Sequence, residues 1–88
     1  MEAIIFVYEE NRPVNYRAFA EWLFRGTPNL IVQKDCSRLI ASSEHVVATL
    51  ELDLGVSKDA AVKLLQNAER LGFLYYYRGC YCMPISSS

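Results

Sequence analysis

The sequence predicts a small α+β domain of three helices with a short C-terminal β-hairpin and an additional N-terminal strand. Residues 3–8, Ala-Ile-Ile-Phe-Val-Tyr, are β-branched and aromatic, as is typical of a strand. Apolar residues spaced three and four positions apart within 58–71 indicate an amphipathic helix. Two apolar and aromatic runs, 73–77 and 80–83, flank Arg78-Gly79 and indicate a hairpin.

Length and composition bound the domain organisation. A chain of 88 residues fits one domain over 1–88, with an N-terminal strand and linker in 1–13 and a frayed tail in 84–88. The composition, 52% hydrophobic and 22% charged, argues against a disordered chain. The longest apolar run, Ala3 to Tyr8, is far shorter than the roughly 20 residues that a membrane-spanning helix needs, and no secretory signal is visible.

The N-terminal run and the first helix are expected to share a surface. Residues 3–8 lack a polar and apolar alternation, which predicts a strand buried on both faces or shared with a partner. Asn15 is placed to cap a helix over 15–25 that Gly26 ends. Its polar stripe is narrow and consists of Arg17, Glu21 and Arg25. This helix must therefore bury two sides, one in its own core and one against the N-terminal strand or a second subunit.

The secondary structure of residues 27–42 is less clearly predicted than that of the second helix, which follows. Within 27–42, Leu30 to Val32 fits a short strand, and 35–41 fits either a helical turn or an extended segment. A second helix opens at Ser42-Ser43-Glu44, where a serine is the expected N-cap. Leu54-Gly55-Val56-Ser57 then breaks the pattern, and Ser57 is placed to cap a third helix from Lys58 to about Leu71.

Two registers fit the C-terminal hairpin. A two-residue loop at Arg78-Gly79 would place Tyr76 opposite Tyr81. A bulge at Gly79 would instead place Tyr75 opposite Tyr81, and the sequence slightly favours it because Arg-Gly is not a preferred two-residue turn.

The order of these elements resembles the winged helix-turn-helix superfamily. The resemblance covers about residues 43–85 and consists of Leu54-Gly55-Val56-Ser57, a 14-residue helix, Gly72-Phe73-Leu74 and a two-stranded hairpin. It implies that the third helix reads the major groove of double-stranded DNA and that the hairpin, or wing, touches an adjacent groove or the backbone.

Carried onto this sequence, the resemblance implies a DNA-binding face on the third helix and wing. Gln66 and Asn67 have amides that can pair with adenine, and Val62 can meet a thymine methyl group. The basic residues are expected to contact phosphate, and the two lysines can also contact guanine. The complete predicted set is Ser57, Lys58, Asp59, Val62, Lys63, Gln66, Asn67, Arg70 and Arg78.

The charge distribution agrees with this placement. Residues 1–54 carry five basic and eight acidic side chains, whereas 55–88 carry four basic and two acidic ones, so the total charge of −1 conceals a basic C-terminal part. Four phosphate contacts imply a salt slope no steeper than about −3.6, and eight in a dimer imply about −7. We therefore expect a homodimer, with its interface at Ile5, Val7, Trp22 and Phe24.

The function expected from the sequence is that of a transcriptional regulator, cytoplasmic or nucleoid-associated, without enzyme activity, cofactor or membrane partner. The alternative is a winged-helix module that uses its aromatic first helix and wing to dock a protein partner instead of DNA. The tyrosines of the wing, Tyr75, Tyr76, Tyr77 and Tyr81, suit either the stacking of unpaired bases or a protein interface.

The three cysteines have three interpretations. Together with the only histidine, they could form a four-ligand zinc set of Cys36, His45, Cys80 and Cys82. Cys36 could instead form a disulfide with Cys80 or Cys82. The simpler interpretation is that they are small buried hydrophobic residues, so no metal is expected.

Overall fold

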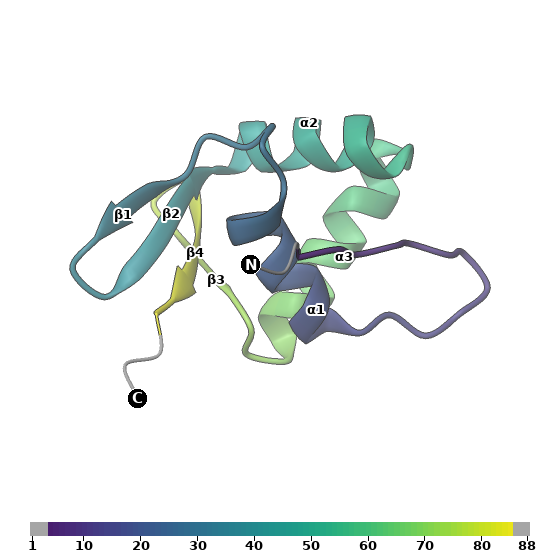
Figure 1. Ribbon diagram of the computed structural model, residues 1–88, viewed down its shortest axis with the longest axis horizontal. Coiled ribbons are helices and arrows are strands. Elements are labelled where there is room, and N and C mark those ends of the chain that lie inside the picture. The colour runs from purple at the N-terminus through teal and green to yellow at the C-terminus, as the bar shows by residue number, and fades with distance from the viewer. Residues whose placement is uncertain (1–3, 86–88) are drawn as a thin grey trace.

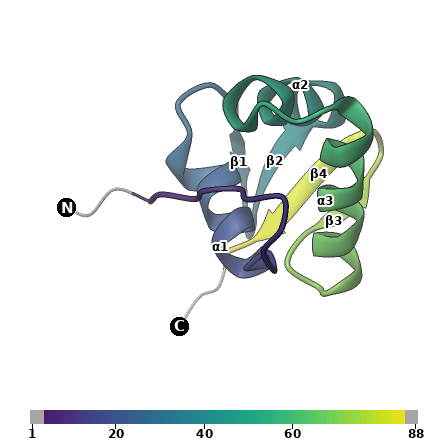
Figure 2. The same cartoon turned by 90° about the vertical axis from the view of Figure 1, so that its right-hand side faces the viewer.

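A four-stranded antiparallel sheet with helices on one of its faces forms the framework of the computed structural model, which describes residues 4–85 (Figures 1 and 2). The strand order is β1-β2-β4-β3. The α+β class with three helices is confirmed. The elements in chain order are α1 (Tyr16–Glu21), its π-helical continuation η1 (Trp22–Gly26), β1 (Gln33–Asp35), β2 (Arg38–Ser42), α2 (Ser43–Leu54), α3 (Lys58–Arg70), β3 (Tyr75–Tyr77) and β4 (Cys80–Pro84).

The register of the sheet separates a core face from an open face. Leu39 pairs with Met83 and Ala41 with Tyr81, and these side chains pack against the helices. The alternate positions on the same strands point to the other face, because successive residues of a strand point to opposite sides. Arg38, Ile40 and Cys82 therefore share the open face.

The core lies between the helices and this sheet. Its largest fully buried side chains include Phe19 and Leu23 from the first helix, Leu50 from α2 and Leu65 from α3. On α3 the buried positions are Ala61, Leu64, Leu65 and Ala68, which is the predicted stripe except at Leu71, where the side chain is 54% exposed.

The first helix changes geometry halfway along its length. Asn15 caps it as predicted, accepting a hydrogen bond from the Ala18 amide at 3.1 Å. From Trp22 to Gly26 the turn widens into a π-helix, closed by a hydrogen bond from the Thr27 amide to the Trp22 carbonyl. Three consecutive residues, Trp22, Leu23 and Phe24, are all buried in this segment, so this helix does bury two sides.

The second and third helices are joined by Gly55, Val56 and Ser57. Gly55 has φ 66°, the left-handed conformation that favours glycine, and ends α2. Ser57 accepts a hydrogen bond from the Ala60 amide and caps α3, as predicted. Ser42 occupies the N-cap position of α2, but its side chain makes no capping hydrogen bond.

The C-terminal hairpin has the two-residue loop, so the preference for a bulge was wrong. Tyr76 pairs with Tyr81, and Tyr77 pairs with Cys80. Arg78 has φ 50° and Gly79 has φ 79°. Positive φ at both central residues is the signature of a type I′ turn, which matches the twist of the flanking strands.

The segment 27–42 contains a hairpin that its sequence did not specify. Gln33 to Asp35 form β1 and Arg38 to Ser42 form β2, so the extended alternative for 35–41 is largely right, while a strand at Leu30 to Val32 is wrong. The predicted frayed tail over 84–88 begins too early. Pro84 belongs to β4, and the Ile85 amide donates to the Ser37 carbonyl. Residues 86–88 lie outside the described residues.

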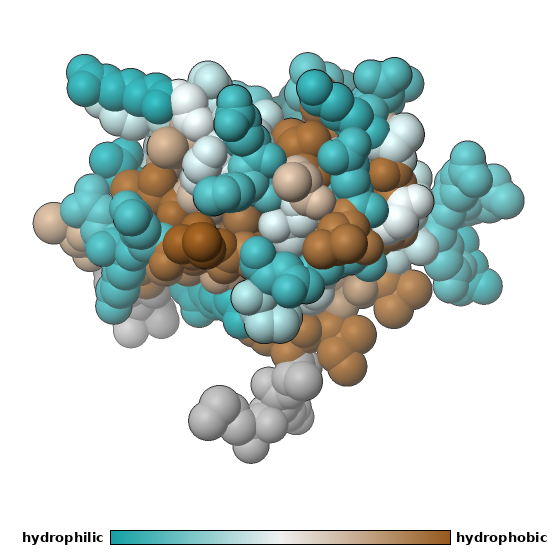
Figure 3. All heavy atoms as spheres, turned by 90° about the horizontal axis from the view of Figure 1, so that it is seen from above, coloured by the Kyte–Doolittle hydropathy of each residue, from teal (hydrophilic) through white to brown (hydrophobic). Residues whose placement is uncertain are grey.

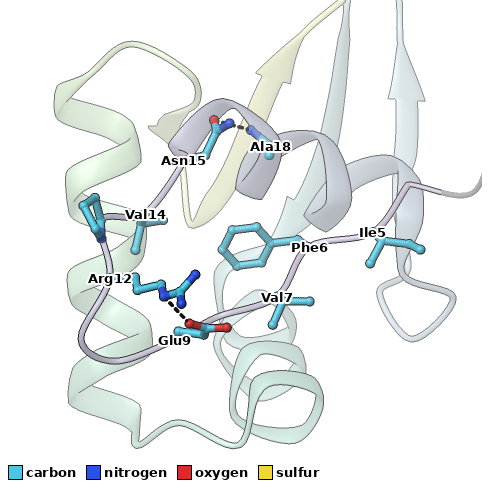
Figure 4. A pocket seen from close by; sticks show the side chains of 9 residues that line it. Ile5, Phe6, Val7, Glu9, Arg12, Val14, Asn15 and Ala18 are labelled. Carbon is cyan, nitrogen blue, oxygen red and sulfur yellow. Dashed lines mark hydrogen bonds and ion pairs between the residues drawn. The ribbon is translucent and has the colours of Figure 1, made fainter.

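The predicted N-terminal strand over 3–8 is also wrong, because residues 4–8 are assigned to no strand, while residue 3 lies outside the described residues. Figure 4 shows the Phe6 ring on one side of this segment and Ile5 and Val7 on the other. Phe6 packs against Phe19 and Trp22, with ring centroids 5.4 and 5.9 Å apart. Packing onto the first helix, rather than pairing with a sheet edge, therefore fixes the segment.

Candidate nucleic-acid interface

The outer face of α3 presents an exposed polar stripe. The stripe contains Asp59, Lys63, Gln66 and Arg70, all exposed and opposite the buried positions of the helix. Among the residues that the structure describes, no ion pair or side-chain hydrogen bond engages Lys58, Lys63 or Gln66. Their polar groups are therefore free to bind a ligand at this surface.

Asn67 lies on the flank of the stripe and is already engaged within the protein. Its amide nitrogen donates to the Tyr16 hydroxyl at 2.9 Å, and its amide oxygen accepts from Arg70 at 3.1 Å. Both ends of the amide are therefore used, the first of them in fastening α3 to α1. Asn67 is a poor candidate for reading a base, and Gln66 is left as the available amide.

The remaining predicted residues lie at the edges of this face. Ser57 is exposed but its hydroxyl oxygen accepts the capping hydrogen bond of α3, and Val62 is half-buried. Arg78 stands at the tip of the wing, where its guanidinium carbon lies 5.2 Å from the centre of the Tyr77 ring. A cation held over an aromatic ring remains charged, so Arg78 still offers a positive group.

Two flanks of α3 meet other parts of the chain. On one flank, Arg12 and Glu10 from the N-terminal segment line a shallow hollow of about 200 Å³ together with Lys63. Arg12 is thus brought beside the predicted face, although it also pairs with Glu9 at 2.8 Å. Sequence spacing gave no signal for Arg12, because some fifty positions separate it from Lys63.

On the other flank, a groove of about 480 Å³ runs between α2 and the wing. Glu44, Val47, Glu51 and Lys58 line it together with Tyr76. The surface over α2 shows apolar side chains among polar ones (Figure 3). The groove is thus partly apolar and has an acidic side next to Lys58.

The four predicted dimer residues divide into two groups. Ile5 and Val7 are 74% and 70% exposed, so their side chains are available to a partner. Trp22 and Phe24 are 9% and 5% exposed and lie in the core of this chain. These two residues must be removed from the predicted interface, because Phe6 and the surrounding core already cover them.

Neither the predicted zinc set nor the alternative disulfide is formed, and Cys36, Cys80 and Cys82 are all free thiols. Within residues 4–85, no group of three or more His, Cys, Asp and Glu side chains is arranged to hold a metal ion. Cys36 is exposed, while Cys82 is buried beneath the open face of the sheet, and burial raises the pKa of its thiol. Cys82 therefore behaves as a small hydrophobic residue.

Comparison with known proteins leaves the family assignment open: no family model, curated protein or solved structure matches the chain. In the part of the chain that the structure describes, no helix is both long and apolar enough to cross a bilayer.

Proposed function

We propose that this protein binds double-stranded DNA through α3 and regulates transcription as a homodimer in the cytoplasm. The observation that carries the proposal is the exposed, unengaged pair Lys63 and Gln66 on the outer face of α3. A second helix of a pair joined by a short glycine-containing turn is the element that enters the major groove in helix-turn-helix proteins.

The chemistry of this face suits duplex DNA. The amide of Gln66 can pair with both the acceptor and the donor of adenine in the major groove. Lys63 can contact phosphate or guanine, while Lys58, Arg70 and Arg78 hold the helix against the backbone. Phosphate contacts fix the register and Gln66 supplies sequence preference.

The decisive measurement is fluorescence anisotropy of a labelled random duplex over a salt series. We expect binding that weakens with salt, with a logarithmic slope of about −3.6 for four contacts and about −7 for eight in a dimer. No binding at low salt would contradict the proposal.

The dimer is proposed to form through the N-terminal segment. Residues 4–8 belong to no helix or strand and run as an open, nearly straight segment (Figure 1), and the backbone hydrogen bonds between described residues outside helices and strands involve none of them. Two copies paired antiparallel about Phe6 would place Ile5 of each next to Val7 of the other, and the symmetric contact closes on itself.

Replacing Ile5 by lysine should weaken this dimer roughly a hundredfold, because the side chain is lost from both halves of the contact. The measurement is sedimentation velocity over a range of micromolar concentrations. Ile31→Lys is the matched control, since Ile31 is 68% exposed and lies in the loop before β1. The proposed contact would be refuted if the wild type, Ile5→Lys and Ile31→Lys associated equally, or if the wild type were a monomer.

A second candidate function is docking of a protein partner in the groove between α2 and the wing. The acidic pair Glu44 and Glu51 beside Val47 favours a partner with a basic and apolar segment. The aromatic first helix cannot take part as first predicted, because Phe19, Trp22 and Phe24 are buried. Failure to bind duplex DNA at low salt would favour this function.

A further inference from the structure

The open face of the sheet carries an aromatic and basic cluster, of which the proposed duplex site uses only Arg78. Tyr75 and Tyr77 lie two positions apart on the edge strand β3 and share the open face with Cys80 and Cys82, their partners on β4. The two tyrosines are 37% and 45% exposed. Side chains at alternate positions of a strand lie about 6.5 Å apart along it, so the rings of Tyr75 and Tyr77 lie next to each other on one surface.

Tyr76 differs from its two neighbours although all three residues are exposed. Its ring packs edge-on against Tyr81 at 5.4 Å on the opposite face of the hairpin. The strand therefore holds two tyrosines on the open face and one on the helix side.

Two arginines give the cluster its charge. The guanidinium carbons of Arg38 and Arg78 lie 5.3 and 5.2 Å from the centre of the Tyr77 ring. Arg38 also donates to the Tyr75 hydroxyl at 3.4 Å, which links the two rings. Asp35 offsets part of the charge of Arg38 through a 3.4 Å ion pair. Arg78 forms no ion pair with the described residues, so the cluster is positive.

We propose that this open face is a second nucleic-acid site, which binds single-stranded DNA or RNA by stacking unpaired bases on Tyr75 and Tyr77. Arg38 and Arg78, which lie over the Tyr77 ring in the free protein, would move off the ring and pair with the phosphates between the stacked bases. Aromatic rings combined with basic side chains recognise single strands without sequence preference, because every base has a face that can stack. The inference does not rest on duplex binding by α3, which lies on the helix side of the sheet (Figure 2), and Arg78 is the one residue that the two sites share.

The number of phosphate contacts distinguishes the single-strand site from the duplex site. Two phosphate contacts on a single strand give a logarithmic salt slope of about −1.4, compared with about −3.6 for four contacts on a duplex. Single-strand binding should therefore persist to salt concentrations at which duplex binding is weakened.

The experiment measures binding of the whole protein to a fluorescent oligothymidine of about twelve nucleotides, a length within the usual range of such sites. Tyr77→Ala should weaken binding about tenfold, because one stacking surface is lost. Tyr76→Ala is the matched control: the same change on the same strand, but on the opposite face, should leave oligothymidine binding unchanged.

Two further variants keep the outcomes separable. Arg38→Gln should make the salt slope shallower by about 0.7, which tests the site even if Tyr77→Ala is poorly folded. Lys63→Glu should leave oligothymidine binding intact while it weakens duplex binding, so failure at one site does not imply failure at the other.

Three results would overturn the inference. The first is the absence of oligothymidine binding at low salt. The second is an equal loss in Tyr76→Ala and Tyr77→Ala, which would deny that the open face is the contact. The third is self-association of the wild type that Tyr77→Ala abolishes, which would assign this face to a second copy of the chain.

Discussion

Replacing Phe19 by alanine should destabilise the protein by about 3–5 kcal/mol, the range observed for loss of a fully buried aromatic side chain. Phe19 is 0% exposed and meets Phe6 and Tyr16 edge-on, with ring centroids 5.4 and 6.2 Å away. It therefore joins the N-terminal segment to the first helix. A domain of this size has a total stability of about 5–13 kcal/mol, so the variant should lose a large part of it.

Urea denaturation followed by circular dichroism measures this loss. Phe6→Ala is the comparison, because Phe6 packs against the same core but is only partly buried. It should cost about 1–2 kcal/mol, since less apolar surface and a smaller cavity are involved. Equal losses in the two variants would mean that the N-terminal segment is as central to the core as the first helix, contrary to the burial of the two rings.

The elements that the sequence predicted well are those specified by local signals. Helix α3 has a side-chain cap at Ser57, an apolar stripe and a glycine just after its end, at Gly72. The signals coincide within the element itself, so no distant contact was needed to predict it. The same local reasoning predicted that a C-terminal hairpin forms but favoured the wrong loop and register, because Arg78 adopts a positive φ that its residue type does not favour.

The elements that the sequence did not specify depend on distant contacts. All three residues of β1 are exposed, so the strand shows no alternation of polar and apolar side chains. It is a strand because β2 pairs with it, and β2 is fixed by β4, about forty residues further along the chain. The apolar run at 4–8 shows the converse, since its strand propensity was overridden by the packing of Phe6 on the first helix.

The residues of the candidate sites also divide into those that local sequence signals predict and those that depend on distant contacts. The exposed face of α3 follows from helical spacing alone, so Lys63, Gln66 and Arg70 could be assigned from the sequence. The engagement of Asn67 by Tyr16 could not, because the two residues are 51 positions apart. Arg38 could not be predicted as a site residue for the same reason. It contacts Tyr75 and Tyr77 only because β4 pairs with both β2 and β3 and so brings these strands into one sheet.

Lys63→Glu should weaken binding of duplex DNA about tenfold for each subunit at moderate salt and make the salt slope shallower by at least about one. Lys63 is exposed at the centre of the α3 stripe and has no partner among the described residues. Reversal of its charge removes one phosphate contact and places a carboxylate against the DNA backbone. The measurement is anisotropy of a labelled duplex over a salt series.

Lys34→Glu is the matched control for this prediction. Lys34 is exposed on β1, at the opposite edge of the sheet from the wing, and its substitution changes the net charge by the same amount. If α3 contacts the duplex, only Lys63→Glu should lose affinity beyond the small effect of net charge, because screening confines electrostatic effects to about 10 Å at 0.1 M salt. Equal losses in the two variants would mean that overall charge rather than the α3 face governs binding. A loss confined to Lys34→Glu would place the duplex at the other edge of the sheet.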